Sequence, residues 1–182
     1  MRLFVGIAIP PKIGERLWAL TGGVKGARWM PPETYHLTLR FLGDAGRPQA
    51  EELDTMLQAI DAPAFELALA GVNYFGTAVR PRVLWAGADP SLPLHQLARR
   101  VDRAARQADF PREDRAFTPH VTIARLHDTS MLEAMTYVQD KSLFRAPPFT
   151  VEQFTLFESR QGKAEPAYIP LADYRLISAS EI

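Results

Sequence analysis

Two short stretches of the sequence share a skeleton of residues that could perform acid–base chemistry. YHLTLRFLG, from Tyr35 to Gly43, and PHVTIARLH, from Pro119 to His127, each contain a histidine, an aliphatic residue, a threonine, a second aliphatic residue and then an arginine. Imidazole has an unperturbed pKa of about 6.5, so it can act as a base or as an acid near neutral pH. Two imidazoles suit a reaction that removes one proton while it supplies another, such as the cleavage of a phosphodiester by water.

Both stretches are rich in aliphatic and β-branched residues, which is typical of strands. Because residues i and i+2 of a strand point to the same face, His36 projects with Thr38, and His120 projects with Thr122. The aliphatic residues between them point into the core. If the two strands face one another, both imidazoles lie around one ligand.

The arginines of the two stretches occupy different positions relative to their histidines. Arg40 lies at i+4 from His36 and is expected to continue its face, whereas Arg125 lies at i+5 from His120 and needs a bulge or the strand end to turn inward. Guanidinium and hydroxyl groups are the donors that stabilise charge developing on the non-bridging oxygens of a phosphodiester. This chemistry requires no metal.

Two other interpretations of the histidines remain open. Strand histidines can simply be satisfied by hydrogen bonds in the structure. They can also bind a metal, with Asp44 or Asp128 as further ligands, although the sequence has no helical H-x-x-x-H pair. The other two histidines, His95 in a predicted helix and His127 just past a strand, are expected at the surface or as capping residues.

Hydrophobic periodicity predicts five elements that recur in the same order, about 80 to 84 residues apart. Each series runs strand, helix, histidine strand, helix, strand. The first series comprises Leu3 to Ile9, Lys12 to Leu20, His36 to Leu42, Gln49 to Ile60 and Phe65 to Phe75; the second comprises Arg82 to Gly87, Leu92 to Ala108, Thr118 to Leu126, Met131 to Asp140 and Phe149 to Phe157.

This order predicts an α+β fold that is duplicated and bilobal. We expect two mostly antiparallel sheets that face one another across a central cleft, with helices on the outer faces. The chain is expected to be one domain over residues 1–182, with internal repeats of approximately 1–78 and 79–160 and a final strand at 167–177.

Composition restricts the possible partners. Lys plus Arg and Asp plus Glu each number 21, so the chain lacks the positive field of proteins that follow many phosphates along a duplex. It has no cysteine, which excludes thiolate nucleophiles and cysteine-based metal sites. The apolar run near Met1 ends at Pro10 and is too short to span a membrane. We expect a cytoplasmic monomer.

With these landmarks the sequence resembles the 2H phosphoesterase superfamily, named for its two H-x-[ST]-x motifs. Within it, the resemblance is to the bacterial and archaeal RNA 2′,3′-cyclic phosphodiesterases, historically called 2′-5′ RNA ligases. The resemblance covers nearly the whole chain and rests on segments in the family order: RLFVGIAIP, YHLTLRFLG, PRVLWAG, FTPHVTIARL, and FTLFESR followed by YIPL. A lone H-x-T motif is not specific, but two with these flanks are.

The resemblance implies hydrolysis of a 2′,3′-cyclic phosphate to a 2′-phosphomonoester, without a cofactor or an essential metal. RNA ends or cyclic nucleotides are the implied substrates. It also implies that His36 donates a proton to the leaving O3′ and that His120 activates water. Thr38 and Thr122 match the motif threonines, Arg125 matches an arginine that follows the second motif, and Arg40 fits the end of the first.

Aromatic residues near the motifs have two interpretations. Phe41 and Trp85 could stack on a base, as in proteins that bind single strands, whereas Phe4 is expected in the core. Two rival functions also remain: ligation of RNA ends through a 2′-5′ linkage, and a module that binds RNA ends without catalysis.

Overall fold

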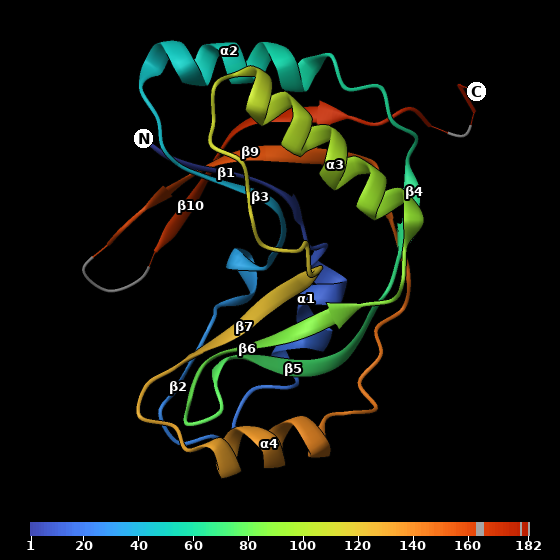
Figure 1. Ribbon diagram of the computed structural model, residues 1–182. Coiled ribbons are helices and arrows are strands. Elements are labelled where there is room, and N and C mark those ends of the chain that lie inside the picture. Colours follow the sequence, from blue (N-terminus) through green and yellow to red (C-terminus); the bar gives the residue numbers. More distant parts are fainter. Residues whose placement is uncertain (163–165, 179, 182) are drawn as a thin grey trace.

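The computed structural model describes residues 1–162, 166–178 and 180–181, which form four α-helices, one short 3-10 helix and ten strands (Figure 1). None of the described helices is long and apolar enough to cross a bilayer. The elements, in chain order, are β1 (Arg2–Ala8), α1 (Pro11–Trp18), β2 (Ala27–Trp29), η1 (Pro32–Thr34), β3 (His36–Asp44), α2 (Arg47–Gln58), β4 (Phe65–Leu67), β5 (Leu69–Thr77), β6 (Arg80–Ala88), α3 (Leu92–Gln107), β7 (His120–Leu126), α4 (Met131–Asp140), β8 (Phe149–Val151), β9 (Gln153–Arg160) and β10 (Ala167–Arg175).

The strands form two halves that meet along one line. The main sheet has the order β10-β9-β1-β3-β7-β6-β5, with β2 also paired to β7 and every pair antiparallel. We call β10, β9, β1 and β3 the upper half-sheet and β7, β6, β5 and β2 the lower half-sheet, as they lie in Figure 1. They are joined by one residue pair, Leu37 with Val121. The prediction of a bilobal α+β fold is confirmed, and the structure adds that the two sheets share this edge.

The helices lie outside the two half-sheets, as predicted. In Figure 1, α2 and α3 cover the upper half-sheet, and α1 and α4 lie against the lower one. Ser91 caps α3 by accepting a bond from the Leu94 amide, and Ser130 and Glu133 form a capping box at α4. Apolar residues of both half-sheets and all four helices form one continuous buried cluster.

Each half-sheet contains strands from distant parts of the chain. The upper half-sheet places β9 beside β1, and the lower half-sheet places β2 beside β7. The strand predicted at Phe65 to Phe75 is two strands, β4 and β5, separated at Ala68. β4 pairs with β8 in a separate two-stranded sheet.

A one-residue register shift changes which side chains of β3 face outward. Successive residues of β1 pair with Thr38 and Arg40, so Leu39 is an extra residue on the β3 side. Leu39 and Arg40 are both buried, and alternation resumes one residue late. Phe41, rather than Arg40, therefore returns to the face of the histidine.

The same shift occurs in β7. Successive residues of β6 pair with Ala124 and Thr122, so Ile123 is the extra residue. Ile123 and Ala124 are fully buried, and Arg125 is exposed on the histidine face. This is the bulge that Arg125 was expected to need.

The expectation that Arg40 continues the histidine face is wrong, because the bulge turns it toward α3. Its Nε lies 3.0 Å from Asp102 Oδ1, and its Nη1 lies 3.4 Å from Glu113 Oε2 and donates to the Phe41 carbonyl at 3.0 Å. Its Nη2 donates to the carbonyl of Pro111. Arg40 thus ties β3 to α3 and to the segment that leads into β7.

We predict that Arg40→Ala lowers the free energy of unfolding by about 2–4 kcal/mol, because it leaves partly buried carboxylates without their cation. Urea unfolding measures this change. Arg47→Ala is the matched control: Arg47 pairs with Glu51 on the exposed face of α2, so we expect its loss to cost at most about 0.5 kcal/mol. Equal effects of the two substitutions would contradict the structural role of Arg40.

Candidate active site

The two histidines are anchored in the same way. His36 Nδ1 lies 2.7 Å from the Thr34 carbonyl oxygen, and His120 Nδ1 lies 2.7 Å from the Thr118 carbonyl oxygen. A carbonyl can only accept, so each Nδ1 carries the hydrogen and donates it. In the neutral imidazole this leaves the Nε2 lone pair available to accept a proton.

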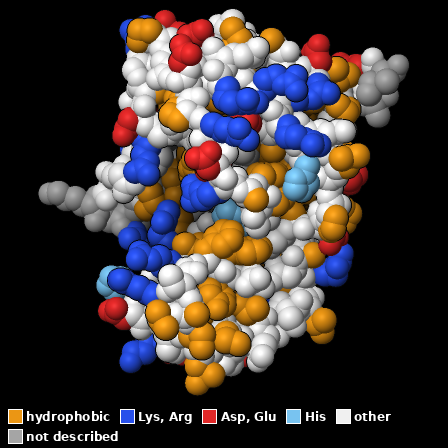
Figure 2. All heavy atoms as spheres, viewed as in Figure 1, with side chains coloured by type: hydrophobic (Ala, Val, Ile, Leu, Met, Phe, Trp, Pro, Cys, Tyr) orange, Lys and Arg blue, Asp and Glu red, His pale blue; other side chains and the backbone are white. Residues whose placement is uncertain are grey.

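The junction of the half-sheets brings the two motifs together. Leu37 and Val121 pair across it and are fully buried. Because side chains alternate along a strand, the residues that flank this pair lie on the opposite face of the junction. They are His36 and Thr38 in β3, and His120 and Thr122 in β7, all partly accessible. Figure 2 shows the surface recessed between the two half-sheets, with hydrophobic side chains in the recess and Lys and Arg side chains along its border.

Aromatic rings enclose the His36 imidazole. Its ring centroid lies 4.7 Å from that of Phe4, 4.8 Å from Tyr168 and 6.1 Å from Phe157. Burial among these rings, together with the charges of His120 and Arg125, lowers the pKa of His36 to about 4, although the bond to the Thr34 carbonyl opposes the change. His36 is therefore neutral in the empty site at pH 7.

His120 has a related but less complete enclosure. Its ring centroid lies 4.8 Å from Phe75 and 5.6 Å from Trp85. Burial lowers its pKa below the ordinary value, opposed by the bond to the Thr118 carbonyl. Tyr168 comes from β10, a strand that the lower half-sheet lacks, so the two imidazoles differ in their surroundings rather than in their anchors.

Three further groups complete the histidine face. Within the described part of the chain, the hydroxyls of Thr38 and Thr122 have no side-chain hydrogen bond, and Arg125 has no ion pair. The charges of His120 and Arg125 act on His36, which places these groups in one electrostatic environment. Two proton-transfer groups, two hydroxyl donors and one guanidinium are suited to bind and transform an anion.

The two aromatic residues predicted to stack on a base lie in different settings. Phe41 is 54% exposed and lies on the open face, 6.0 Å from Phe4 between ring centroids. Trp85 packs against Phe75 at 4.8 Å, and its Nε1 is buried without a partner among the described residues. The ring of Phe41 is thus accessible to a ligand, whereas the ring of Trp85 packs beside His120. Phe4 is buried, as expected.

The carboxylates considered as metal ligands lie apart from the histidine pair. Asp44 ends β3, at the opposite end of the strand from His36. Asp128 lies beyond β7, with its Oδ2 3.8 Å from the exposed His127. In the ranges that the structure describes, no three His, Cys, Asp or Glu side chains gather in one place. His95 is exposed on α3, where its ring contacts Phe117.

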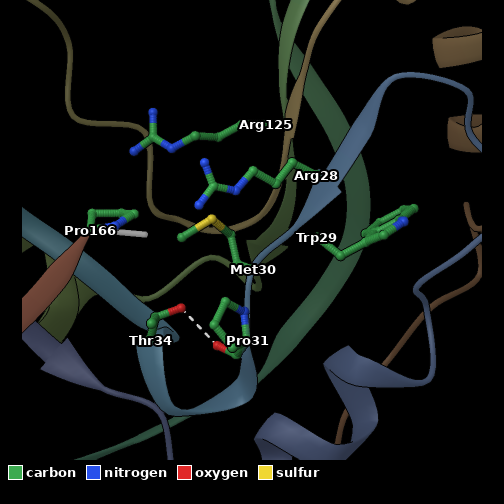
Figure 3. A pocket seen from close by; sticks show the side chains of 7 residues that line it. All are labelled: Arg28, Trp29, Met30, Pro31, Thr34, Arg125 and Pro166. Atoms are coloured by element: carbon green, nitrogen blue, oxygen red, sulfur yellow. Dashed lines mark hydrogen bonds between the residues drawn. The ribbon is translucent and has the colours of Figure 1, made fainter. Parts of the chain in front are cut away.

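Sequence reasoning did not assign several residues around the histidines. Tyr168 was placed in a final strand without a role, and Phe157 and Phe75 were assigned only to predicted strands. The positions of Phe75 and Phe157 at matching ends of the two repeated series were the available signal. Arg28 on β2 was not considered at all; it pairs with Arg125 across the strands and lies beside it in Figure 3.

Comparison with known proteins assigns the family. The sequence profile of the 2′-5′ RNA ligase superfamily matches residues 10–163. An RNA 2′,3′-cyclic phosphodiesterase of Escherichia coli K12 is 31% identical over 184 residues, covering 96% of both chains. The protein of the same name from Geobacillus stearothermophilus is 32% identical over 159 residues, which is 84% of this chain but only 49% of that protein. The chain thus spans about half the length of this second relative.

A solved structure agrees with this assignment. Escherichia coli LigT, crystallised with 3′-AMP, is 29% identical and superimposes with a TM-score of 0.76 over 96% of this chain and 97% of its own. The profile match covers far more than half of the chain, and the fold agrees over nearly all of it. The chain therefore belongs to the 2′-5′ RNA ligase superfamily, a group of 2H phosphoesterases.

Proposed function

We propose that this protein is an RNA 2′,3′-cyclic phosphodiesterase that hydrolyses cyclic phosphate ends to 2′-phosphomonoesters by acid–base catalysis with two histidines and no metal. The observation that carries the proposal is the pair of Nε2 atoms, each freed by an Nδ1 anchor, on one face of the junction between half-sheets. The related proteins named above carry the same activity in their names.

The reaction follows from the protonation states of the two imidazoles. Neutral His120 accepts a proton from water through Nε2 as the water oxygen forms a bond to phosphorus. The bond from phosphorus to O3′ breaks, and protonated His36 donates its Nε2 proton to O3′. The products are a 2′-phosphate and a 3′-hydroxyl. His120 then holds one proton more and His36 one proton fewer than at the start, and proton exchange with solvent restores both imidazoles. The family resemblance, rather than symmetry, assigns the two roles.

The remaining groups on the face act on the phosphate. The hydroxyls of Thr38 and Thr122 donate to the non-bridging oxygens, and the exposed guanidinium of Arg125 adds positive charge. Removal of a single donor of this kind typically lowers the rate by about 10²- to 10³-fold. Phe41 offers a ring on which the terminal base can stack.

The low pKa of His36 requires an explanation for its role as an acid. In the empty site, burial and nearby positive charge disfavour the imidazolium. A bound phosphodiester brings a negative charge that favours the protonated form, so the pKa of His36 rises when substrate binds. His36 therefore becomes protonated, and able to act as an acid, when the substrate binds.

We predict that His36→Ala and His120→Ala each lower turnover of 2′,3′-cyclic AMP by at least about 10²-fold, because each removes one proton-transfer group. Chromatography of the products measures the rate and identifies 2′-AMP. His95→Ala and His127→Ala are matched controls, since both histidines are exposed and lie outside the histidine face. The assay contains EDTA.

Other outcomes of this assay identify the rival functions. Wild-type turnover that both active-site variants retain would contradict histidine catalysis. The absence of turnover despite tight binding of RNA ends would indicate a binding module. Loss of all activity on chelation would favour a metal. Adding an RNA with a 5′-hydroxyl measures ligation, which we expect to be minor because water is abundant.

We predict a bell-shaped pH profile of kcat/KM with its maximum below pH 6.5. The profile reports the free enzyme, in which burial lowers the pKa of both histidines, so the form with one proton shared between them is most populated at mildly acid pH. The maximum of kcat should lie at higher pH, because bound phosphate favours the imidazolium. A kcat/KM that stays constant from about pH 6 to 9 would contradict a protonated acid.

We predict that Tyr168→Ala moves the maximum of kcat/KM to higher pH. Tyr168 covers the His36 ring, so its removal admits water and returns the pKa of His36 toward the ordinary value of about 6.5. Tyr168→Phe is the control, because it keeps the ring and should keep the profile. If both substitutions shift the profile equally, the hydroxyl and not burial controls the pKa.

A further inference from the structure

The exposed face of α3 carries a local excess of positive charge. Asp102 is the only carboxylate of this helix. Against it stand four exposed arginines: Arg99, Arg100, Arg103 and Arg106. The chain as a whole has equal numbers of positive and negative side chains, so the excess on α3 is not a property of the composition. Figure 2 shows Lys and Arg side chains gathered over α3, on the same face of the molecule as the recess between the half-sheets.

Contacts within the protein account for two of the four arginines. Arg106 lies in the last turn of α3, and its Nε is 3.1 Å from Asp102 Oδ2. The other oxygen of Asp102 pairs with Arg40, at 3.0 Å. Arg100 donates to the carbonyl of Asp61, which follows α2. Arg100 and Arg106 therefore hold α3 in place.

Arg99 and Arg103 have no comparable contact. They lie one turn apart, about 6 Å along the axis at roughly 1.5 Å per residue, so they project from the same side of α3. Within the part of the chain that the structure describes, neither side chain has a hydrogen bond or an ion pair. Like charges at this spacing slightly destabilise a helix, so the stability of α3 gives no reason for the pair.

A short path of contacts joins these arginines to the histidine face. His95 lies one turn before Arg99, and its ring centroid is 5.2 Å from that of Phe117. Phe117 precedes Thr118, whose carbonyl holds His120 Nδ1. These steps together span at most roughly 30 Å, at about 1.5 Å per helical residue and about 3.5 Å per extended residue. A strand of about ten nucleotides covers that distance even at the 3.4 Å or so per nucleotide of a stacked strand.

We propose that Arg99 and Arg103 form a docking surface for the phosphate backbone of a single RNA strand whose 3′ end lies at the histidines. This inference rests on the proposed function and deepens it, because the surface makes a longer RNA a better substrate than a cyclic mononucleotide. Guanidinium groups bind phosphates through charge and through paired N–H donors. Phosphates carry no sequence information, so the surface accepts any base sequence.

The test compares an RNA of about ten nucleotides that ends in a 2′,3′-cyclic phosphate with 2′,3′-cyclic AMP. The measured quantity is the ratio of kcat/KM on the RNA to kcat/KM on cyclic AMP. The double variant Arg99→Gln/Arg103→Gln should lower this ratio by about tenfold, as is reasonable for two exposed charge-assisted contacts. The ratio cancels any loss of folded protein, because one preparation turns over both substrates.

Lys12→Gln/Arg16→Gln is the matched control. Lys12 and Arg16 are exposed and one turn apart on α1, so this variant removes two charges of the same spacing from a different helix. It should leave the ratio at its wild-type value. Increasing salt should lower kcat/KM on the RNA less steeply for the α3 variant than for the wild type. The expected difference in logarithmic slope is about 1.4, at about 0.7 for each phosphate contact of a single strand.

Two outcomes would overturn the docking surface. One is a ratio that the α3 variant leaves at the wild-type value, which would assign these arginines to an acidic protein partner instead of RNA. The other is a control ratio that falls as far as that of the α3 variant. Turnover of cyclic AMP by the wild type is measured first. If that turnover is absent, the proposed function fails; if it is present and the α3 variant keeps the ratio, only the docking surface fails.

Discussion

The geometry of the site depends on one backbone pair, Leu37 with Val121, which joins β3 to β7. Both side chains are fully buried, so the strands cannot slip by one residue without moving a histidine into the core. The hydrophobic effect on two aliphatic side chains thereby fixes which face carries His36 and His120. No other residues of β3 and β7 pair within the described ranges, and Figure 2 shows a recess between the half-sheets.

Much of this fold could be predicted because local periodicity reflects local structure. The predicted helix from Met131 to Asp140 has the observed bounds, whereas no turn residue marks the break at Ala68 in the segment from Phe65 to Phe75. Arg40 was misplaced because the bulge at Leu39 depends on how β1 pairs with β3, and no residue of β3 encodes its partner's register. The contact of Tyr168 with His36 likewise depends on the strand order. Sequence alone therefore predicted which strands carry the histidine face better than how individual side chains are oriented on it.

The two halves of the site share their anchors but differ in their walls. β10 pairs with β9 at the edge of the upper half-sheet, and through Tyr168 it adds a third ring around His36. The lower half-sheet has no corresponding strand, so His120 keeps fewer aromatic neighbours and a less perturbed pKa. An added edge strand, rather than a change in either motif, distinguishes the two imidazoles. Two similar motifs can in this way acquire different proton affinities.

The placement of β9 beside β1 has a consequence for the order in which the protein matures on the ribosome. β1 and β3 can pair early, but Phe157, which stacks on Phe4 beneath His36, is made about 150 residues later. At roughly 5 to 20 residues per second, translation needs on the order of ten seconds to supply it. Until then the His36 imidazole lacks part of the ring wall that lowers its pKa. Completion of the surroundings of His36 is thus a late event of synthesis, even though the histidine itself is made early.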